Sequence, residues 1–143
     1  AYTVSTVEAQ TRQETVKEYA AGEAVELTVQ EGERIMITPQ VQTGKLILQS
    51  VHRSQGIPAY RGTLELLGTK EGTVIINELP LEDYLYSVVP SEMPASYPQE
   101  ALMAQAICAR TYAYTHMQHA GYEALGAHVD DSSSYQVYNN ILE

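Results

Sequence analysis

Hydrophobic and polar residues alternate in short runs through the first half of the chain, which is the pattern of β-strands with one buried face. The runs lie at residues 24–29, 34–38, 45–51, 60–66 and 73–77. The last two bracket a segment containing Gly68 and Gly72, which indicates a hairpin. Residues 1–77 are therefore predicted to form a small antiparallel sheet or half-barrel.

The spacing of apolar residues changes to a helical period after Pro80. Apolar side chains then recur three and four positions apart, at Leu81, Tyr84, Leu85 and Val88. This pattern predicts a short helix that ends before Pro90, because the residue preceding a proline is disfavoured in the helical conformation. A second helix is predicted from Ser96, where residues 96–99 match a capping box, to about His119. With the sheet first and the helices after it, the predicted fold class is α+β.

The composition fits a folded domain and limits its partners. Across 143 residues, 18 acidic and 8 basic side chains give a formal net charge of -10. This charge argues against nucleic acid or an anionic membrane surface, since phosphate binding needs clustered Lys and Arg. The single cysteine, Cys108, excludes an internal disulfide and is expected to be a small buried residue. No apolar run is long enough to span a membrane, and without an initiator Met or signal peptide the chain has the features of a mature or excised piece.

One glutamate lies between the two predicted helices, in a segment suited to hold an acid. Pro90 and Pro94 stiffen this segment, and Glu92 between them has the apolar neighbours Val89 and Met93. A carboxyl group fixed in apolar surroundings keeps its proton to higher pH and can act as a proton donor near neutral pH. The alternative for Glu92 is an ordinary solvated loop residue.

The second predicted helix carries further polar candidates. After Lys70 the only basic residue is Arg110, which can bind a carboxylate of Glu92 or of a ligand, or form a surface ion pair. Gln105 and Tyr112 lie seven positions apart on one helix face, where Gln105 can bind ligand or satisfy backbone groups. The chain has 11 Tyr and no Trp or Phe. A tyrosine ring has an apolar face and a polar tip, which suits either a half-buried core or a sugar.

Histidines and aspartates near the end of the chain offer only a weak metal site. His116 and His119 lie three positions apart on one helix face, and His128 lies two before the pair Asp130 and Asp131. Histidine near a helix C-terminus also complements the helix dipole, and this explanation is favoured over a metal ion. No metal and no cofactor is therefore assigned.

Several stretches of the second half follow one family pattern. They read NELPLEDYL at 77–85, VVPSEMP at 88–94, EALMAQA at 100–106 and ARTYA at 109–113, with YRG at 60–62, DD at 130–131 and QVY at 136–138. Together they resemble the stage II sporulation protein D family (SpoIID), which includes the amidase enhancers of bacterial cell walls. The resemblance covers residues 60–140. It implies a catalytic core at 60–143, with 1–59 as a β-rich N-terminal part of the same domain.

The resemblance implies an extracytoplasmic lytic transglycosylase of peptidoglycan. Such an enzyme cleaves the β-1,4 bond of glycan strands stripped of peptide, as in spore engulfment, and leaves 1,6-anhydro-muramic acid ends. Glu92 matches the family's catalytic glutamate. Polar positions of the family's substrate groove match Gln105, Arg110, Gln136 and Tyr138.

Three departures from the family pattern affect what the resemblance implies. Met103 stands where the family commonly has lysine. The stretch SSSY at 132–135 replaces the Cys and His with which some members hold zinc, so no metal is carried over. The family domain usually continues further, which implies that part of the groove would lie beyond Glu143.

A lytic transglycosylase needs a single carboxyl group, because the 6-hydroxyl of muramic acid attacks C1 in place of water. Glu92 would donate the proton and later take one back. Arg110 would bind the lactyl carboxylate, and Tyr112 and Tyr138 would stack on sugar faces. The expected partners are peptidoglycan glycan strands, with a cell-wall amidase or other engulfment proteins.

Three rival functions remain open from the sequence. The first is a non-catalytic peptidoglycan-binding module that enhances a cell-wall amidase. The second is a hydrolase in which Glu92 works with Asp130 or Asp131, which requires carboxyl groups about 5–10 Å apart. The third is a structural β-rich segment of a larger wall protein.

Overall fold

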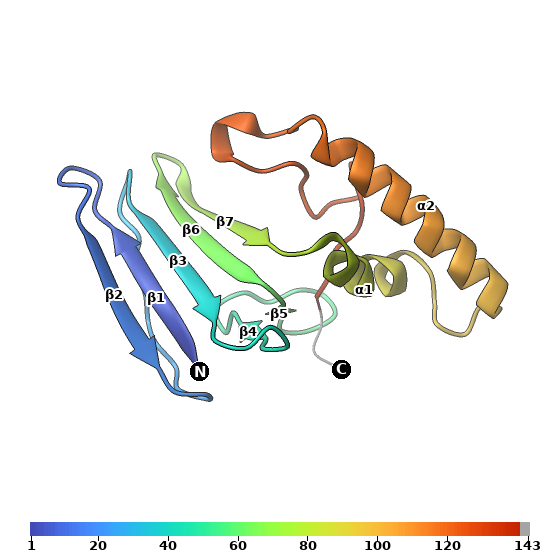
Figure 1. The fold of residues 1–143 in the computed structure, drawn as a ribbon, viewed down its shortest axis with the longest axis horizontal. Helices are drawn as coiled ribbons and strands as arrows, with labels where there is room; N and C mark the ends of the chain where they lie inside the picture. The colour runs from blue at the N-terminus through green and yellow to red at the C-terminus, as the bar shows by residue number, and fades with distance from the viewer. Residues whose placement is uncertain (141–143) are drawn as a thin grey trace. The chain divides into compact units, whose positions relative to one another are not determined.

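The first half of the chain forms an antiparallel sheet, and the fold is α+β as the sequence predicts (Figure 1). The computed structural model describes residues 1–140. Five strands pair in the order β2-β1-β3-β6-β7, and they are β1 (Tyr2–Val7), β2 (Glu14–Tyr19), β3 (Arg34–Pro39), β6 (Thr63–Thr69) and β7 (Gly72–Glu78). The two short strands β4 (Leu46–Ile47) and β5 (Ala59–Tyr60) form a separate pair.

The strand prediction holds for β3, β6 and β7 but fails at other positions in the first half. Residues 24–29 alternate as predicted but form no strand, and the run at 45–51 shortens to Leu46–Ile47. The topology explains the first difference. β1 pairs with β2 on one side and β3 on the other, so the connection from β2 to β3 must pass β1 without joining its ladder.

The core of the sheet is one face of its three central strands. Val4, Ile35, Ile37, Leu64 and Leu66 are each at most 8% exposed. They lie opposite one another across the ladders, where Ile35 pairs with Leu66 and Ile37 with Leu64. Burial alternates residue by residue along β6, because successive side chains of a strand point to opposite faces.

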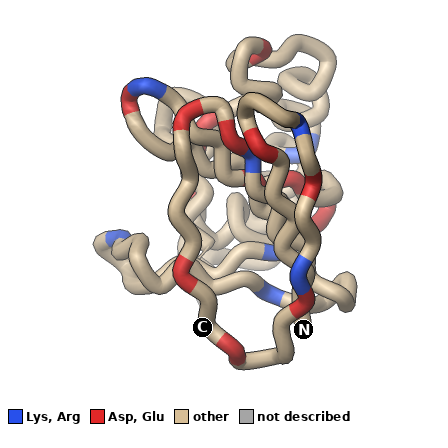
Figure 2. The backbone as a smooth tube through the Cα atoms, turned by 90° about the vertical axis from the view of Figure 1, so that its left-hand side faces the viewer, with Lys and Arg blue, Asp and Glu red and all other residues tan. Residues whose placement is uncertain are grey.

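Basic residues are scattered along the chain and do not gather in one stretch (Figure 2). Three of them form ion pairs with carboxylates, in the pairs Arg34–Glu65, Arg53–Asp131 and Arg110–Glu82. This distribution does not provide the clustered cations that phosphate binding needs.

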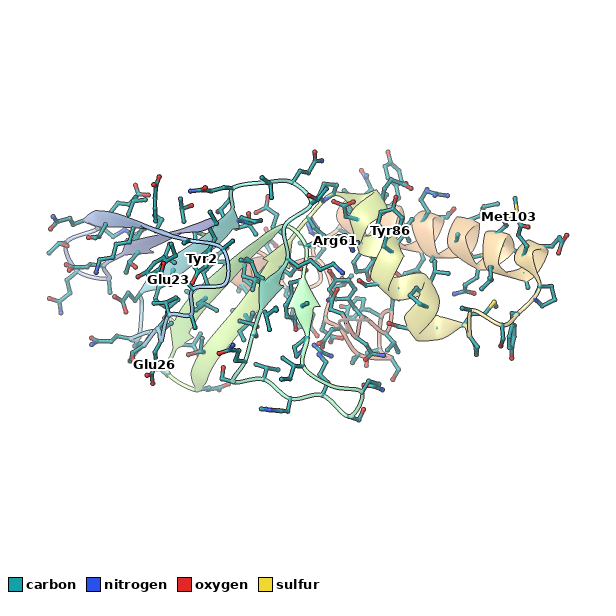
Figure 3. The ribbon with its side chains drawn as sticks, turned by 90° about the horizontal axis from the view of Figure 1, so that it is seen from below. Tyr2, Glu23, Glu26, Arg61, Tyr86 and Met103 are labelled. Atoms are coloured by element: carbon teal, nitrogen blue, oxygen red, sulfur yellow. The ribbon has the colours of Figure 1, made fainter. Side chains whose placement is uncertain are left out.

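Tyr2 ties the start of the chain to the connection that follows β2. Its ring stacks on Tyr19 of β2 at a centroid distance of 5.2 Å. Its hydroxyl donates a hydrogen bond of 2.8 Å to the backbone oxygen of Glu23 (Figure 3). These contacts hold the outer strand pair in register where few apolar side chains are buried.

Two helices and a short 3-10 helix form most of the second half. They are α1 (Leu81–Glu92), α2 (Gln99–Met117) and η1 (Glu123–Leu125). The predicted end of α1 before Pro90 is wrong. The helix continues through Pro90, and the backbone N–H of Met93 still donates to Val89 at 2.9 Å.

The predicted capping box at Ser96 does not form, and α2 begins three residues later, after Pro98. A cap at Ser96 would make Tyr97 the first helical residue. Tyr97 precedes a proline, which disfavours the helical conformation there. Cys108 is exposed, contrary to the prediction, because α2 buries mainly the side that carries Ala109 and Ala113. None of the helices in residues 1–140 is long and apolar enough to cross a membrane.

The chain divides into two compact units. The sheet unit comprises residues 1–47 and 59–79, and the helical unit comprises residues 48–58 and the chain from Pro80 onward. The segment 48–58 therefore belongs with the helices although it lies between two strands. The family resemblance implies another division, into residues 1–59 and 60–143, which is drawn by function. The two units above are defined by packing alone, so the functional division stays a prediction.

Gly68 provides a test of the packing of the sheet unit. A Cβ atom on this residue would lie 1.9 Å from the backbone oxygen of Gln30, and the Gly68 N–H already donates to Glu33 at 3.0 Å. We expect Gly68→Ala to lower the free energy of unfolding by about 3 kcal/mol, because rigid backbone must move. Urea unfolding followed by circular dichroism measures this loss.

The matched control is Gly22→Ala. Gly22 has a φ of 81°, and a Cβ atom added there would meet nothing within 4 Å. Only backbone strain of about 1 kcal/mol is therefore expected. Equal losses in the two variants would contradict the close approach at Gly68.

Candidate functional site

The segment 136–140 is held between the two helices of the helical unit, and Gln136 links it to both. Gln136 is only 7% exposed. Its Oε1 accepts a hydrogen bond of 3.2 Å from the Tyr84 hydroxyl of α1, and its Nε2 donates one of 3.2 Å to the backbone oxygen of Ala109 on α2. A buried amide with both ends bonded fixes the spacing of the groups it joins.

The same segment is bonded along α1 by three side chains of that helix. The N–H of Val137 donates to Glu92 Oε1 at 2.7 Å, and the N–H of Asn139 donates to Ser91 Oγ at 3.2 Å. Ser87 Oγ donates to Asn140 Oδ1 at 2.7 Å. The segment belongs to no strand, so Glu92 and Ser91 satisfy backbone N–H groups that a sheet would otherwise pair.

Glu92 is the last residue of α1, whereas the sequence predicted a loop position with apolar surroundings. Its side chain is exposed, so the predicted apolar enclosure is absent. Among residues 1–140, Val137 is the hydrogen-bond partner of its carboxylate. The carboxylate is therefore oriented at the surface.

Arg110 forms a surface ion pair with Glu82, which was one of the three alternatives for this residue, and a pairing with Glu92 is not observed. Arg110 Nε donates to Glu82 Oε1 at 2.7 Å, and Nη2 donates to Oε2 at 3.0 Å. These hydrogen bonds lower the pKa of Glu82 and raise that of Arg110. Both side chains are in contact with solvent, so the pair contributes little to stability and can exchange partners.

Tyr84 lies at the centre of the helical unit's polar side chains. Burial raises its pKa to about 12, and electrostatic interactions with Tyr112 and Glu92 add to the shift. The Tyr138 ring lies 4.9 Å from the Tyr84 ring. The structure thus brings the buried side chains of Gln136 and Tyr138 against one phenol.

The predicted site residues differ in how far they reach the surface. Tyr112 is 37% exposed, and Gln105, two turns earlier on α2, is half-buried. Gln136 and Tyr138 are 7% and 6% exposed, so they are buried and would act by positioning other groups. Met103, at the position where lysine was expected, is 57% exposed on α2 (Figure 3).

Sequence reasoning missed the positioning roles of Tyr84, Ser87 and Ser91. These residues are spaced three and four positions apart, so they form a polar line along α1. The available signal was this polar line, because it lies on a helix that also has an apolar face. Its partner segment lies about fifty positions away, which no local pattern indicates.

Three of the residues considered as metal ligands, Asp130, Asp131 and His116, have other partners. Asp130 accepts hydrogen bonds from the hydroxyls of Ser132 and Tyr122, which lower its pKa, and Asp131 pairs with Arg53. His116 Nδ1 is 2.9 Å from the backbone oxygen of Tyr112. Residues 1–140 contain no group of three or more His, Cys, Asp or Glu side chains placed to hold a metal ion.

The comparisons with known proteins assign the chain to a family. The model of the stage II sporulation protein family, SpoIID, matches residues 69–143, which is more than half of the chain. The chain therefore belongs to the SpoIID family. This match includes both helices and the segment 136–140.

Curated relatives are similar to part of the chain. An uncharacterized protein of Brachyspira hyodysenteriae is 42% identical over 80 residues, 56% of this chain and 22% of that protein. Stage II sporulation protein D of Bacillus subtilis is 44% identical over 70 residues, 48% of this chain and 20% of that protein. The amidase enhancer of the same species is 44% identical over 54 residues, 38% of this chain and 6% of that protein.

The matched regions are thus about a fifth or less of the length of these relatives. No solved structure matches the chain.

The link through Gln136 can be tested by its removal. Gln136→Leu keeps the side-chain volume but leaves the Tyr84 hydroxyl and the Ala109 oxygen without their partner. We expect a loss of about 1–3 kcal/mol in the free energy of unfolding. The control is Gln118→Leu at the exposed end of α2, where a change within about 0.5 kcal/mol is expected. Urea unfolding followed by helical circular dichroism compares them, and a neutral Gln136→Leu would contradict the link.

The raised pKa of Tyr84 predicts a loss of stability at alkaline pH. The unfolded state ionises near the ordinary tyrosine value of 10.0, while the folded state resists ionisation up to about 12. The stabilising contribution is therefore complete below the unfolded value and is lost as the pH rises through the folded one. Denaturant unfolding across this pH range measures the loss.

Tyr84→Phe removes the ionisable group, so its unfolding free energy should fall less steeply than that of the wild type over the same range. Tyr114→Phe, at a residue 59% exposed, should retain the wild-type slope. A Tyr84→Phe curve parallel to the wild-type curve would contradict the assignment.

Proposed function

We propose that this chain carries the acid–base centre of a peptidoglycan lytic transglycosylase, with Glu92 as its single catalytic residue. Membership of the SpoIID family supports a role in the cell wall, since named relatives are a stage II sporulation protein D and an amidase enhancer. The observation that carries the proposal is the hydrogen bond from the Val137 N–H to Glu92 Oε1. It orients a carboxyl group that is otherwise open to a ligand.

This hydrogen bond suits both protonation states of an acid–base catalyst. In the protonated acid, Oε1 is the carbonyl oxygen and accepts the Val137 N–H, while Oε2 carries the proton. In the carboxylate, Oε1 accepts the same N–H, and Oε2 is ready to take a proton. The geometry need not change between the two half-reactions, which is the preorganisation that catalysis requires.

The reaction balances with this one group. Glu92 gives its proton to the glycosidic oxygen as the bond from that oxygen to C1 of muramic acid breaks. The 6-hydroxyl oxygen of the same sugar bonds to C1 and closes the 1,6-anhydro ring, and its proton passes to Glu92. A hydrolase would need a second carboxylate near Glu92. Asp130 and Asp131 are engaged by Ser132, Tyr122 and Arg53, which favours the single-acid reaction.

Because Glu92 is exposed, the glycan strand itself would have to exclude water from its carboxyl group. A bound strand would cover the carboxyl group and exclude water from it, which strengthens the electrostatic interactions of the reacting atoms. The exposed ring of Tyr112 would stack on a sugar face, and Gln105 on the same helix face would contact its polar groups. Gln136 and Tyr138 are positioning residues in this scheme.

Arg110 is the candidate for the lactyl carboxylate of muramic acid. Its present partner, Glu82, is an exposed carboxylate, so a ligand carboxylate can replace it with little loss. Met103 offers no charge where lysine was expected, which leaves Arg110 as the basic residue of α2.

The proposed setting is the bacterial cell envelope, outside the cytoplasm. Peptidoglycan glycan strands are the proposed substrate, and a cell-wall amidase or other engulfment proteins are proposed partners. The net charge of -10 and the scattered basic residues argue against nucleic acid as a partner (Figure 2).

The second candidate function is a non-catalytic peptidoglycan-binding module that stimulates an amidase. Two observations favour it: the similarity to the amidase enhancer of Bacillus subtilis and the uncharged Met103. The two functions differ in whether the chain itself creates new glycan ends.

Glu92→Gln tests the proposal directly. The glutamine oxygen can still accept the Val137 N–H, so the fold is expected to persist. Without an acidic proton, release of anhydro-muramyl products from denuded strands should fall by about 10²- to 10⁴-fold. Mass spectrometry of the products measures this release. The control is Glu100→Gln, another exposed glutamate of the helical unit, which should retain activity.

Each other outcome selects a rival function. Anhydro products from Glu92→Gln at the wild-type rate would refute the catalytic role of Glu92. Products with reducing ends would indicate a hydrolase. Strand binding by the wild type without any cleavage would support the enhancer module.

A further inference from the structure

A row of four aromatic rings lies on the helical unit, and only one of its members was predicted as a site residue. It consists of Tyr112, His116, Tyr135 and Tyr122, and we call it the aromatic row. Tyr112 and His116 have a centroid distance of 4.2 Å, His116 and Tyr135 5.4 Å, and Tyr135 and Tyr122 6.0 Å. The row runs from Tyr112 on α2 to Tyr122, which precedes η1.

The chain from 121 to 135 is folded so that the Tyr135 ring contacts His116 of α2 and the Tyr122 ring contacts Tyr135. The Gly121 N–H donates to the His128 oxygen and the Tyr122 N–H to the Ala127 oxygen, which closes the loop around η1. A Cβ atom on Gly121 would lie 2.4 Å from the Tyr135 hydroxyl, so this position requires glycine for the ring to fit. Such a close approach of ring and backbone is a specific arrangement and restricts the ring.

Polar groups along the row are fixed in direction as well. The Tyr122 hydroxyl donates to Asp130 Oδ2 at 2.6 Å, and Asp130 Oδ1 accepts from Ser132. Because a backbone oxygen only accepts, His116 Nδ1 carries the hydrogen in its contact with Tyr112. The row thus combines two rings that reach solvent, Tyr112 and Tyr122, with an oriented carboxylate acceptor at Asp130.

These features fit a chain of neutral sugars. Pyranose rings offer flat C–H faces that pack on aromatic rings, and their equatorial hydroxyls donate to fixed acceptors. Aromatic rows also bind single-stranded nucleic acid, but only with cations along the backbone. Here the charged neighbours are Asp130 and Asp131, and Arg53 is paired with the latter. A polymer with a charge on every unit is therefore disfavoured, whereas in a glycan strand only the muramic acid units carry a carboxylate.

We propose that the aromatic row binds neutral N-acetylglucosamine units of a glycan strand whose cleavage site lies at Glu92. The position of the cleavage site at Glu92 rests on the proposed function. Binding of the strand to the row does not require catalysis. Tyr112 would contact the sugar nearest Glu92, and Tyr122 would contact one further along. The strand would then gain affinity with each unit that reaches the row.

Binding of N-acetylglucosamine oligomers of defined length tests the proposal. The measurement is isothermal titration calorimetry on the whole chain in the Glu92→Gln background, where turnover does not interfere. We expect affinity to rise with oligomer length. Tyr122→Leu should weaken binding of the long oligomers about tenfold, because a flat ring is lost, and should leave the shortest oligomers unaffected.

Two further variants separate ring stacking from folding. Tyr122→Phe loses the Asp130 bond but keeps the ring, so long-oligomer affinity should stay within a factor of about three. Tyr114→Leu removes a tyrosine that is 59% exposed and lies two positions from Tyr112, on a different face of α2, and should change nothing. Circular dichroism confirms that each variant is folded.

The outcomes distinguish this inference from the proposed function. Unchanged long-oligomer affinity in Tyr122→Leu, or equal losses in Tyr122→Leu and Tyr122→Phe, would overturn the aromatic row as a binding site even where Glu92→Gln abolishes cleavage. Conversely, length-dependent binding that is lost in Tyr122→Leu would support the row even where Glu92 proves not to be catalytic.

Discussion

The hydrogen bonds that hold segment 136–140 against α1 and α2 are the constraint on which the helical unit depends. Gln136 bonds to both helices, and Glu92, Ser91 and Ser87 bond to the three positions 137, 139 and 140. A single such bond contributes only about 1 kcal/mol. Together they require one placement of the segment, because a shift would leave several partly buried polar groups unpaired at once. The carboxylate proposed for catalysis is one of these bonded groups, so its orientation follows from the fold of the unit.

The sequence predicted the elements whose pattern is local and missed those that topology decides. β3 and β6 alternate because one face of each is buried, and the helical period after Pro80 locates α1. β2 is exposed along most of its length and so has no such pattern. Residues 24–29 have the pattern, yet β1 is already paired on both sides. Pro98 sets the start of α2, whereas Pro90 fails to end α1, since bonds to the distant residues 137 and 139 stabilise its last turn.

The candidate site was only partly predictable for a related reason. The prolines around Glu92 indicated a rigid acid, but its helical position and exposure depend on contacts 45 residues away. The sequence cannot distinguish a polar residue that faces a ligand from one that satisfies buried backbone groups, and Gln136 is of the second kind. The pairing of Arg110 with Glu82 joins residues 28 positions apart, beyond any helical spacing rule. The catalytic role of Glu92 stays a prediction.

In the proposed site, one set of residues orients Glu92 and another set binds the glycan strand. The groups that orient Glu92 are bonded within the protein, so a ligand does not compete for them. The rings proposed to bind the strand reach solvent, and Tyr112 and Tyr122 are 37% and 36% exposed. Both rings are restricted by neighbouring aromatic residues, so little side-chain entropy is lost when a sugar stacks on them. Stacking on these rings stabilises the bound substrate and the transition state equally, so it does not accelerate the chemical step. Rate acceleration then depends on the one preorganised carboxyl group.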